Sequence, residues 1–292
     1  MSDLIDAHLH LWNPKTLGYD WLSYVPAIAE THDADEWAAL NIPTEQAVFV
    51  QASDNPADAL KEAQWVAAID HPTLNIGGIV AYAPLEKGSA VAEDIAALKS
   101  VTKLRGIRRN VQGEPDGFLS APAYIDGLTE VARAGLSIDM CSKAHQMPEL
   151  IRTLNILFDR VPEAIVILDH LGKPDIKTHQ GDITGGDWAN HFKTLSGFPN
   201  LATKISGLST EADWGHWQPA HLTPYIHHAI DSFGPDRCLF GGDWPVVDLS
   251  GGYDRWLAVF DAATSDLSPH DRAAIRSETA RRLYRLPAST LP

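Results

Sequence analysis

Short apolar runs alternate with amphipathic segments along the whole chain. Eight runs have the near-continuous apolar character of parallel strands that are buried on both faces. They are Leu4–Ala7, Ala47–Gln51, Ile76–Tyr82, Leu104–Arg108, Leu136–Met140, Ile165–Asp169, Ala202–Ser206 and Cys238–Gly242. Spacings of three and four between apolar residues predict helices at Pro56–Ile69, Pro122–Ala134, Met147–Phe158, Pro219–Phe233 and Pro269–Leu283. Several of these segments open with proline, which suits a first helical turn.

This repeated alternation of strand and helix is typical of a (β/α)₈ barrel. The chain has 292 residues, an ordinary length for one such domain, and it contains no evident linker or internal repeat. A doubly wound open sheet is the alternative, and the absence of GxGxxG and GxxxxGK[ST] motifs weakens it. We therefore expect a single TIM-type barrel domain over residues 1–292.

The predicted connection after the first strand, residues 11–44, is long for a barrel loop. It is rich in aromatic residues: Trp12, Tyr19, Trp21, Tyr24 and Trp37. Loops at this position lie over the barrel mouth, so the aromatic side chains either cover a substrate or pack the loop onto the scaffold.

Composition narrows the functional classes. The net charge of −15 argues against binding to nucleic acids or anionic membranes, because phosphate neutralisation needs clustered Lys and Arg. The two cysteines, Cys141 and Cys238, lie in apolar surroundings without a CxxC motif and are interpreted as reduced core thiols. We see no signal peptide and no apolar run of about 20 residues. These features predict a cytoplasmic protein that acts on a small molecule, and they leave homo-oligomer formation open.

Two histidines follow one another closely at the end of the first strand. In Asp6-Ala7-His8-Leu9-His10, strand alternation puts His8 and His10 on one face, about 7 Å apart along the strand. Catalytic groups of such barrels lie at the carboxyl ends of the strands. The pair can therefore converge on one cation or one substrate group.

Other strand ends carry charged side chains. Arg108 shares the inward alternation with Gly106, and Arg109 follows it. A guanidinium group at this place suits a carboxylate or carbonyl oxygen, whereas a surface salt bridge is the alternative for Arg109. Asp139 on the fifth strand either acts directly or orients a neighbour, and His145 follows in the next loop.

The last three strands complete the set. His170 ends the sixth strand where a ligand or a general acid or base belongs, and Asp169 is expected to point the other way. Lys204 lies on the seventh strand. Asp243 follows Gly241-Gly242, whose missing side chains let the backbone crowd the site, and Asp243 is the expected central carboxylate.

The motifs IDAHLHLW, FVQA, LRGIRRNVQ, ILDHLGKP, KISGLSTEADW and FGGDWPV occur in this order. Together they resemble the amidohydrolase-2 family of the amidohydrolase superfamily, in particular its sugar-lactone hydrolases of the L-fuconolactonase and L-rhamnonolactonase type. The similarity runs from Ile5 to about Leu286. It implies a distorted (β/α)₈ barrel and hydrolysis of a lactone ring.

By motif, the resemblance assigns His8, His10, His170 and Asp243 to the family site and Arg108 to its GxR arginine. Two departures matter. Fuconolactonase-like relatives carry His where Arg109 stands here. Metal-dependent members usually have two mid-barrel histidines, but here only His170 is evident. A binuclear centre is therefore not expected. Two alternatives stay open: a site with one divalent ion, for which Zn²⁺ is the first candidate, and a site without metal.

The resulting hypothesis is a lactonase in which Asp243 takes a proton from water as the water attacks the carbonyl. The oxyanion would be stabilised by a metal on His8, His10 and Asp243, with His170 as a further candidate ligand. In the alternative without a metal, the imidazoles and Arg108 would stabilise it. His170 would protonate the leaving alkoxide or bind the carbonyl. Candidate substrate contacts are Trp12, Tyr19, Trp21, Arg109, Asp139, His145, Lys204 and Trp244. The alternatives are an aromatic-acid decarboxylase, a lactone isomerase and a non-catalytic sugar-acid binder.

Overall fold

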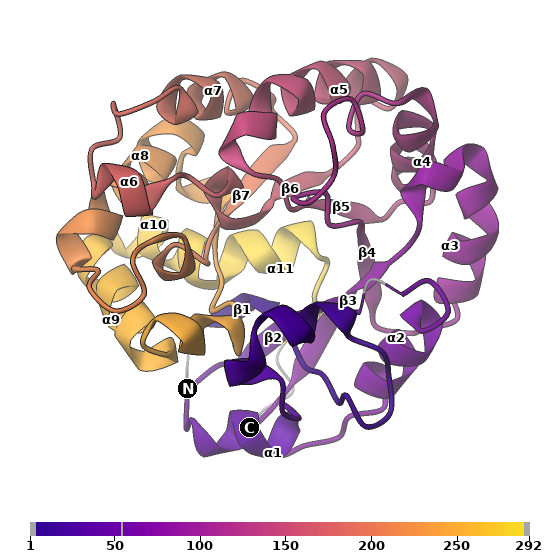
Figure 1. Ribbon diagram of the computed structural model, residues 1–292, viewed down its shortest axis with the longest axis horizontal. Helices are drawn as coiled ribbons and strands as arrows, with labels where there is room; N and C mark the ends of the chain where they lie inside the picture. Colours follow the sequence, from indigo (N-terminus) through magenta and orange to yellow (C-terminus); the bar gives the residue numbers. More distant parts are fainter. Residues whose placement is uncertain (1–3, 54, 289–292) are drawn as a thin grey trace.

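Eight parallel strands form a nearly closed barrel in a computed structural model that describes residues 4–53 and 55–288 (Figure 1). The strands pair in chain order, and an isolated parallel bridge from Leu9 to Trp244 links the first strand to the segment after the last. Their bounds are β1 Ile5–Leu9, β2 Gln46–Val50, β3 Ile76–Tyr82, β4 Leu104–Arg108, β5 Ser137–Met140, β6 Val166–Leu168, β7 Leu201–Ile205 and β8 Cys238–Phe240. The predicted TIM-type barrel is confirmed.

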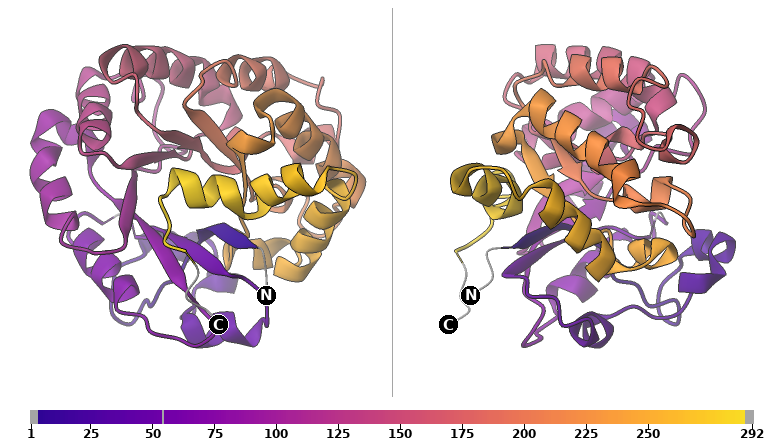
Figure 2. Two further views of the ribbon diagram at one scale, coloured as in Figure 1. Left: turned by 180° about the vertical axis from the view of Figure 1, so that it is seen from behind. Right: turned by 90° about the vertical axis from the view of Figure 1, so that its left-hand side faces the viewer.

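Helices surround the barrel (Figures 1 and 2). They are α1 Ala34–Ala39, α2 Ala59–Ala67, α3 Ala92–Leu98, α4 Pro122–Arg133, α5 Met147–Arg160, α6 Ile176–His179, α7 Trp188–Leu195, α8 Pro219–Phe233, α9 Tyr253–Ala263, α10 Pro269–Ala273 and α11 Thr279–Leu283. A π-helical turn, Ala274–Glu278, joins α10 to α11. No helix among the described residues is long and apolar enough to cross a membrane.

The predicted elements differ from the observed ones mainly at their ends. Sequence periodicity locates all eight strands, but it misses α1, α3, α6, α7 and α9. The sixth strand ends at Leu168, earlier than predicted, because His170 adopts a left-handed conformation with φ 53°. An extended strand cannot continue through a residue with positive φ.

One end of the barrel is closed by the C-terminal helix. Ala280, Leu283 and Tyr284 pack against apolar side chains that point into the barrel, such as Ile5 and Val48. Figure 2 places α11 at this end and the segment between β1 and β2 at the opposite end. This end of the barrel is therefore filled by apolar side chains, and the carboxyl ends of the strands, where catalytic groups of this architecture lie, are at the other end.

Candidate active site

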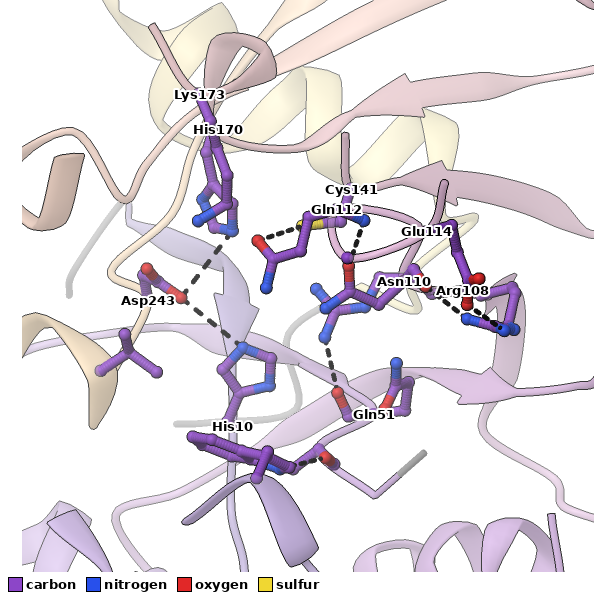
Figure 3. A pocket seen from close by; sticks show the side chains of 15 residues that line it. His10, Gln51, Arg108, Asn110, Gln112, Glu114, Cys141, His170, Lys173 and Asp243 are labelled. Atoms are coloured by element: carbon purple, nitrogen blue, oxygen red, sulfur yellow. Dashed lines mark hydrogen bonds and ion pairs between the residues drawn. The ribbon is translucent and has the colours of Figure 1, made fainter. Parts of the chain in front are cut away.

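A cavity of about 390 Å³ lies at the carboxyl ends of the strands (Figure 3). Its walls come from β1, β2, β4, β5, β6 and β8 or the residues that follow them. The lining residues are His10, Trp21, Gln51, Ala52, Arg108, Arg109, Asn110, Gln112, Gly113, Glu114, Cys141, His170, Lys173, Asp243 and Val246. A cavity of this size accommodates a small molecule.

His8 and His10 point to the same side of β1, as the alternation predicts. Their Nε2 atoms lie 3.1 Å apart, and both side chains are buried. The carbonyl oxygen of Val50 lies 2.8 Å from Nδ1 of His10. A carbonyl only accepts hydrogen bonds, so this contact places the His10 proton on Nδ1 and leaves the Nε2 lone pair toward His8 and Asp243.

Asp243 reaches the same point from the end of β8. Its Oδ1 lies 3.5 Å from Nε2 of His10 and 3.7 Å from Nε2 of His8. Asp243 has φ 59°, and its backbone N–H donates to the carbonyl of His8 over 2.8 Å. A Cβ on Gly241 would lie 2.8 Å from Cβ of His8. The absence of a side chain at Gly241 therefore lets β8 approach β1 closely enough to bring the carboxylate to the histidines.

His170 completes this cluster. Its Nε2 lies 3.9 Å from Oδ1 of Asp243, and its Nδ1 lies 2.9 Å from the hydroxyl of Ser206. A Cβ on Gly207 would come within 2.5 Å of Nδ1 of His170. Glycine at that position makes room for the imidazole, and the Ser206 hydroxyl orients it.

Arg108 projects into the barrel as predicted, whereas Asp169 does not point away as expected. Asp169 shares the inward side of β6 with Ile167, and its Oδ2 accepts a hydrogen bond from Nη1 of Arg108 over 3.1 Å. Arg108 also donates from Nη2 to the carbonyl of Gln51 over 2.7 Å, while its buried Nε has no partner among the described residues. Nη1 also lies 3.3 Å from Nε2 of His8, so both Nη atoms of Arg108 are engaged and its Nε is enclosed in the cavity wall.

Below the cavity lies a buried charged network. Nζ of Lys204 contacts Oδ2 of Asp139 at 2.5 Å and Oδ1 of Asp169 at 3.0 Å. The hydroxyl of Tyr284 donates to the same Asp139 oxygen over 2.6 Å. Lys204 is fully buried and Asp139 is nearly so. Lys204 and Asp139 are therefore bound to one another inside the barrel.

Burial and neighbouring charge shape the protonation states of the cluster. Burial lowers the pKa of His8 and of His10, and it lowers the pKa of His170 to about 4. Burial alone would raise the pKa of Asp243, but the neighbouring His170 and His10 outweigh it and hold that pKa below the usual range. Near neutral pH the site consists of an ionised carboxylate among neutral imidazoles.

Such a donor set fits one divalent cation. The three distances between Nε2 of His8, Nε2 of His10 and Oδ1 of Asp243 are 3.1, 3.5 and 3.7 Å. Ligand atoms at about 2.0–2.1 Å from a tetrahedral ion lie about 3.4 Å apart, so the spacing agrees. A second set of His8, Asp169 and His170 also converges, but both Asp169 oxygens already contact Arg108 or Lys204. The first set is the candidate metal site.

Of the candidate substrate contacts, Trp21 and Arg109 line the cavity. Arg109 is paired with Glu86 and Glu114, at 3.1 and 2.6 Å, which is the salt-bridged alternative that the sequence left open. Trp21 donates from its indole N–H to the carbonyl of Ala52 over 2.9 Å, and so ties the long first loop to the end of β2.

The other candidate contacts lie elsewhere in the described structure. Trp12, Tyr19 and Trp244 are buried and do not line the cavity; Trp12 and Tyr19 pack in a cluster under the first loop. His145 is exposed in a short 3₁₀ turn. The buried pair Asp139 and Lys204 does not line the cavity either.

Sequence reasoning missed several residues of the cavity wall: Gln51, Asn110, Gln112, Cys141 and Lys173. Each follows the end of a strand by a few positions. That position was the available signal, because residues just beyond parallel strands face the mouth of a barrel. Polar amides give no stronger sign of function in a sequence.

Two proteins resemble this chain over nearly its full length. An uncharacterized protein y4mH from Sinorhizobium fredii is 31% identical, with 98% of this chain and all of that protein covered. An L-fucono-1,5-lactonase from Burkholderia multivorans is 28% identical over 97% of this chain and 96% of its own length.

Solved structures resemble the fold. Two crystal structures of an amidohydrolase from Burkholderia multivorans each cover 97% of this chain and 99% of their own. One, with bound HEPES, has a TM-score of 0.86 at 27% identity. The other, with bound zinc, has a TM-score of 0.84 at 28% identity. The amidohydrolase family model matches residues 5–286, and the chain therefore belongs to the amidohydrolase family.

Proposed function

We propose that this protein hydrolyses the lactone ring of a sugar acid. The observation that carries the proposal is the convergence of His8, His10, His170 and Asp243 beside a small-molecule cavity that is lined on its other side by Arg108 and neutral amides. The similarity to an L-fucono-1,5-lactonase over 97% of the chain supports the choice of a lactone.

The metal in this proposal is one Zn²⁺ ion held by His8, His10 and Asp243. Two imidazoles and a carboxylate are a common zinc ligand set in hydrolases. When bound, zinc supplies Lewis acidity that acidifies water and polarises a carbonyl. The Val50 carbonyl fixes the proton of His10 on Nδ1, so its Nε2 lone pair is available to the ion.

Asp243 is the proposed proton acceptor. Its pKa is held below the usual range, so the carboxylate is ionised near neutral pH but is a weak base on its own. It takes a proton from the water as the water oxygen forms a bond to the lactone carbonyl carbon. The depressed pKa means that the water must be acidified for this transfer to be favourable.

Arg108 and His170 stabilise the negative charge that develops on the substrate oxygens. The guanidinium of Arg108, which lines the cavity, is a donor for the oxyanion, and such donors commonly contribute roughly 3–4 kcal/mol. His170 is neutral near pH 7, and its Nε2 faces the cavity beside Asp243. As the ring C–O bond breaks, the proton that Asp243 took from water moves through His170 to the leaving alkoxide, and the product is an open-chain hydroxy acid.

A panel of aldono-1,4- and 1,5-lactones in a pH-indicator assay tests this function. We expect one proton released per ring opened, at a rate well above spontaneous hydrolysis. Release of CO₂ from an aromatic acid, with no acid release from any lactone, would instead establish the decarboxylase alternative. Interconversion of two lactones without net acid release would establish the isomerase, and binding without turnover the non-catalytic binder.

A further inference from the structure

The side chain of Gln51 lies at the edge of the cavity, and its Oε1 is enclosed there without a hydrogen-bond partner among the described residues. Gln51 is 2% exposed. Figure 3 shows it across the cavity from Asp243 and His170. A buried amide without a partner costs free energy in the absence of ligand, so its position favours a ligand that supplies the missing hydrogen bond.

The backbone around Gln51 holds this amide in place. Its N–H donates to the carbonyl of Val80 over 2.8 Å, and its carbonyl accepts from Nη2 of Arg108 over 2.7 Å. The next two backbone N–H groups, of Ala52 and Ser53, donate to the Glu62 carboxyl group at 3.3 and 2.9 Å. These bonds fix the backbone from which the side chain projects, so its attachment point at the cavity edge is preorganised.

The charges of the cavity wall exclude one class of ligand. Arg109 contacts Glu86 and Glu114, and Nζ of Lys173 donates to Glu211 over 2.6 Å. Arg108, the third cation of the wall, contacts Asp169. Each cationic side chain that lines the cavity is thus already neutralised by a carboxylate. A substrate carboxylate would have to displace one of these partners.

The wall also carries polar side chains without charge. Asn110 and Gln112 line it, and both are amides. Amides offer donors and acceptors together, which matches hydroxyl groups, since a hydroxyl both donates and accepts. Hydroxyl recognition therefore agrees with the wall better than carboxylate recognition does.

We propose that Gln51 is a specificity-determining residue whose amide binds one hydroxyl group of a neutral, polyhydroxylated lactone. The inference rests on the proposed lactonase function. It adds that the substrate is uncharged and that Gln51 is the residue that binds one of its hydroxyl groups. A site built to bond a hydroxyl rejects the analogue that lacks it, because the buried amide is then left unpaired.

The test compares wild-type protein with Gln51→Met, which keeps the length of the side chain and removes its hydrogen bonds. The substrates are the best neutral aldonolactone and its mono-deoxy derivatives, one for each hydroxyl. We expect wild type to lose about 10–100-fold in kcat/KM with one derivative. We expect Gln51→Met to lose a similar factor with the parent lactone and to discriminate less than about twofold at that hydroxyl.

Gln46 supplies a matched control. It begins β2 at the opposite end of the strand from the cavity, it is 1% exposed, and its Oε1 also has no partner among the described residues. Gln46→Met should leave the discrimination between parent and deoxy lactones unchanged. Because both substrates are measured on one preparation, the ratio does not depend on how much of a variant folds.

A lactone that carries a carboxylate, prepared from a uronic acid, tests the charge. We expect its kcat/KM to be at least about tenfold below that of the neutral lactone of equal ring size. Equal or better turnover of the anionic lactone would overturn the inference, as would undiminished discrimination at every hydroxyl in Gln51→Met. If wild type opens no lactone at all, the proposed function itself fails, which is a distinct result.

Discussion

Nζ of Lys204 lies 3.0 Å from Nδ1 of His8, on the edge of the ring opposite the atom that faces His10. Lys204 therefore contacts the candidate site at His8, on the side away from the cavity, and does not line the cavity. The same ammonium group neutralises Asp139 and Asp169, so a single lysine joins the candidate metal site to the charged interior of the barrel.

Removing this lysine should destabilise the fold. Lys204→Met leaves Asp139 and Asp169 buried without their shared cation, and breaking a buried ion pair typically costs about 3–5 kcal/mol. Urea unfolding followed by circular dichroism measures the change. Adding Asp139→Asn to the variant should recover part of the loss. Lys193→Met, on an exposed residue of α7, should change the free energy of unfolding by less than about 0.5 kcal/mol. An equal loss in both single variants would contradict the ion-pair explanation.

Substitution of the central carboxylate should abolish most activity. Asp243→Asn removes the proposed proton acceptor and one proposed metal ligand, so kcat/KM should fall about 10²–10⁴-fold on the best lactone. Asp231→Asn, on an exposed residue of α8, is the matched control and should keep full activity. An undiminished rate in Asp243→Asn would rule out the mechanism.

Metal content gives an independent measure of the candidate site. We expect one divalent ion per chain by elemental analysis, loss of turnover after dialysis against a chelator, and recovery on addition of Zn²⁺. His10→Ala should lower the zinc content, because it removes one of the three convergent ligands. His216→Ala, at a histidine whose side chain is 86% exposed, should not. Full turnover by chelated, metal-free protein would show that the side chains suffice.

The stability of the protein should depend on pH through Glu62. Burial raises the pKa of this carboxyl group from 4.5 to about 8, although hydrogen bonds from Ser53 and Ala52 oppose the increase. The folded state therefore keeps a proton that the unfolded state releases above about pH 4.5, and its stability falls as the pH rises toward 8.

The matching variant isolates this effect. Glu62→Gln keeps a side-chain acceptor for the backbone but does not titrate. Urea unfolding is measured for both proteins across this pH range. The free energy of unfolding of the wild type should fall by a few kcal/mol relative to the variant. Each tenfold difference in proton affinity between the folded and unfolded states corresponds to about 1.4 kcal/mol. Parallel pH profiles for the two proteins would mean that Glu62 is ionised in the folded state at neutral pH.

Local patterns were sufficient for part of this site. Two-residue alternation brings His8 and His10 to one face of β1 in any barrel, and Asp243 follows the last strand at the shared edge. Those positions are determined within one strand, so the sequence could predict them. The turn after β6 shows where such reasoning stops. Asp169 lies two residues after Ile167, which packs inside the barrel, so alternation along β6 itself points Asp169 inward, and the left-handed turn at His170 then brings the next side chain to the same site.

The sequence by itself determined the barrel, the order of its strands and the four side chains of the candidate metal and catalytic cluster, because strand periodicity and position at a strand end are local properties. Only the tertiary structure decided which charges neutralise each other. Lys204 pairs with Asp139 across 65 residues, and the cations of the cavity wall pair with carboxylates on other loops. These pairings depend on distances between separate strands. They withdraw Lys204 from the substrate and leave the Gln51 amide without a partner in the cavity.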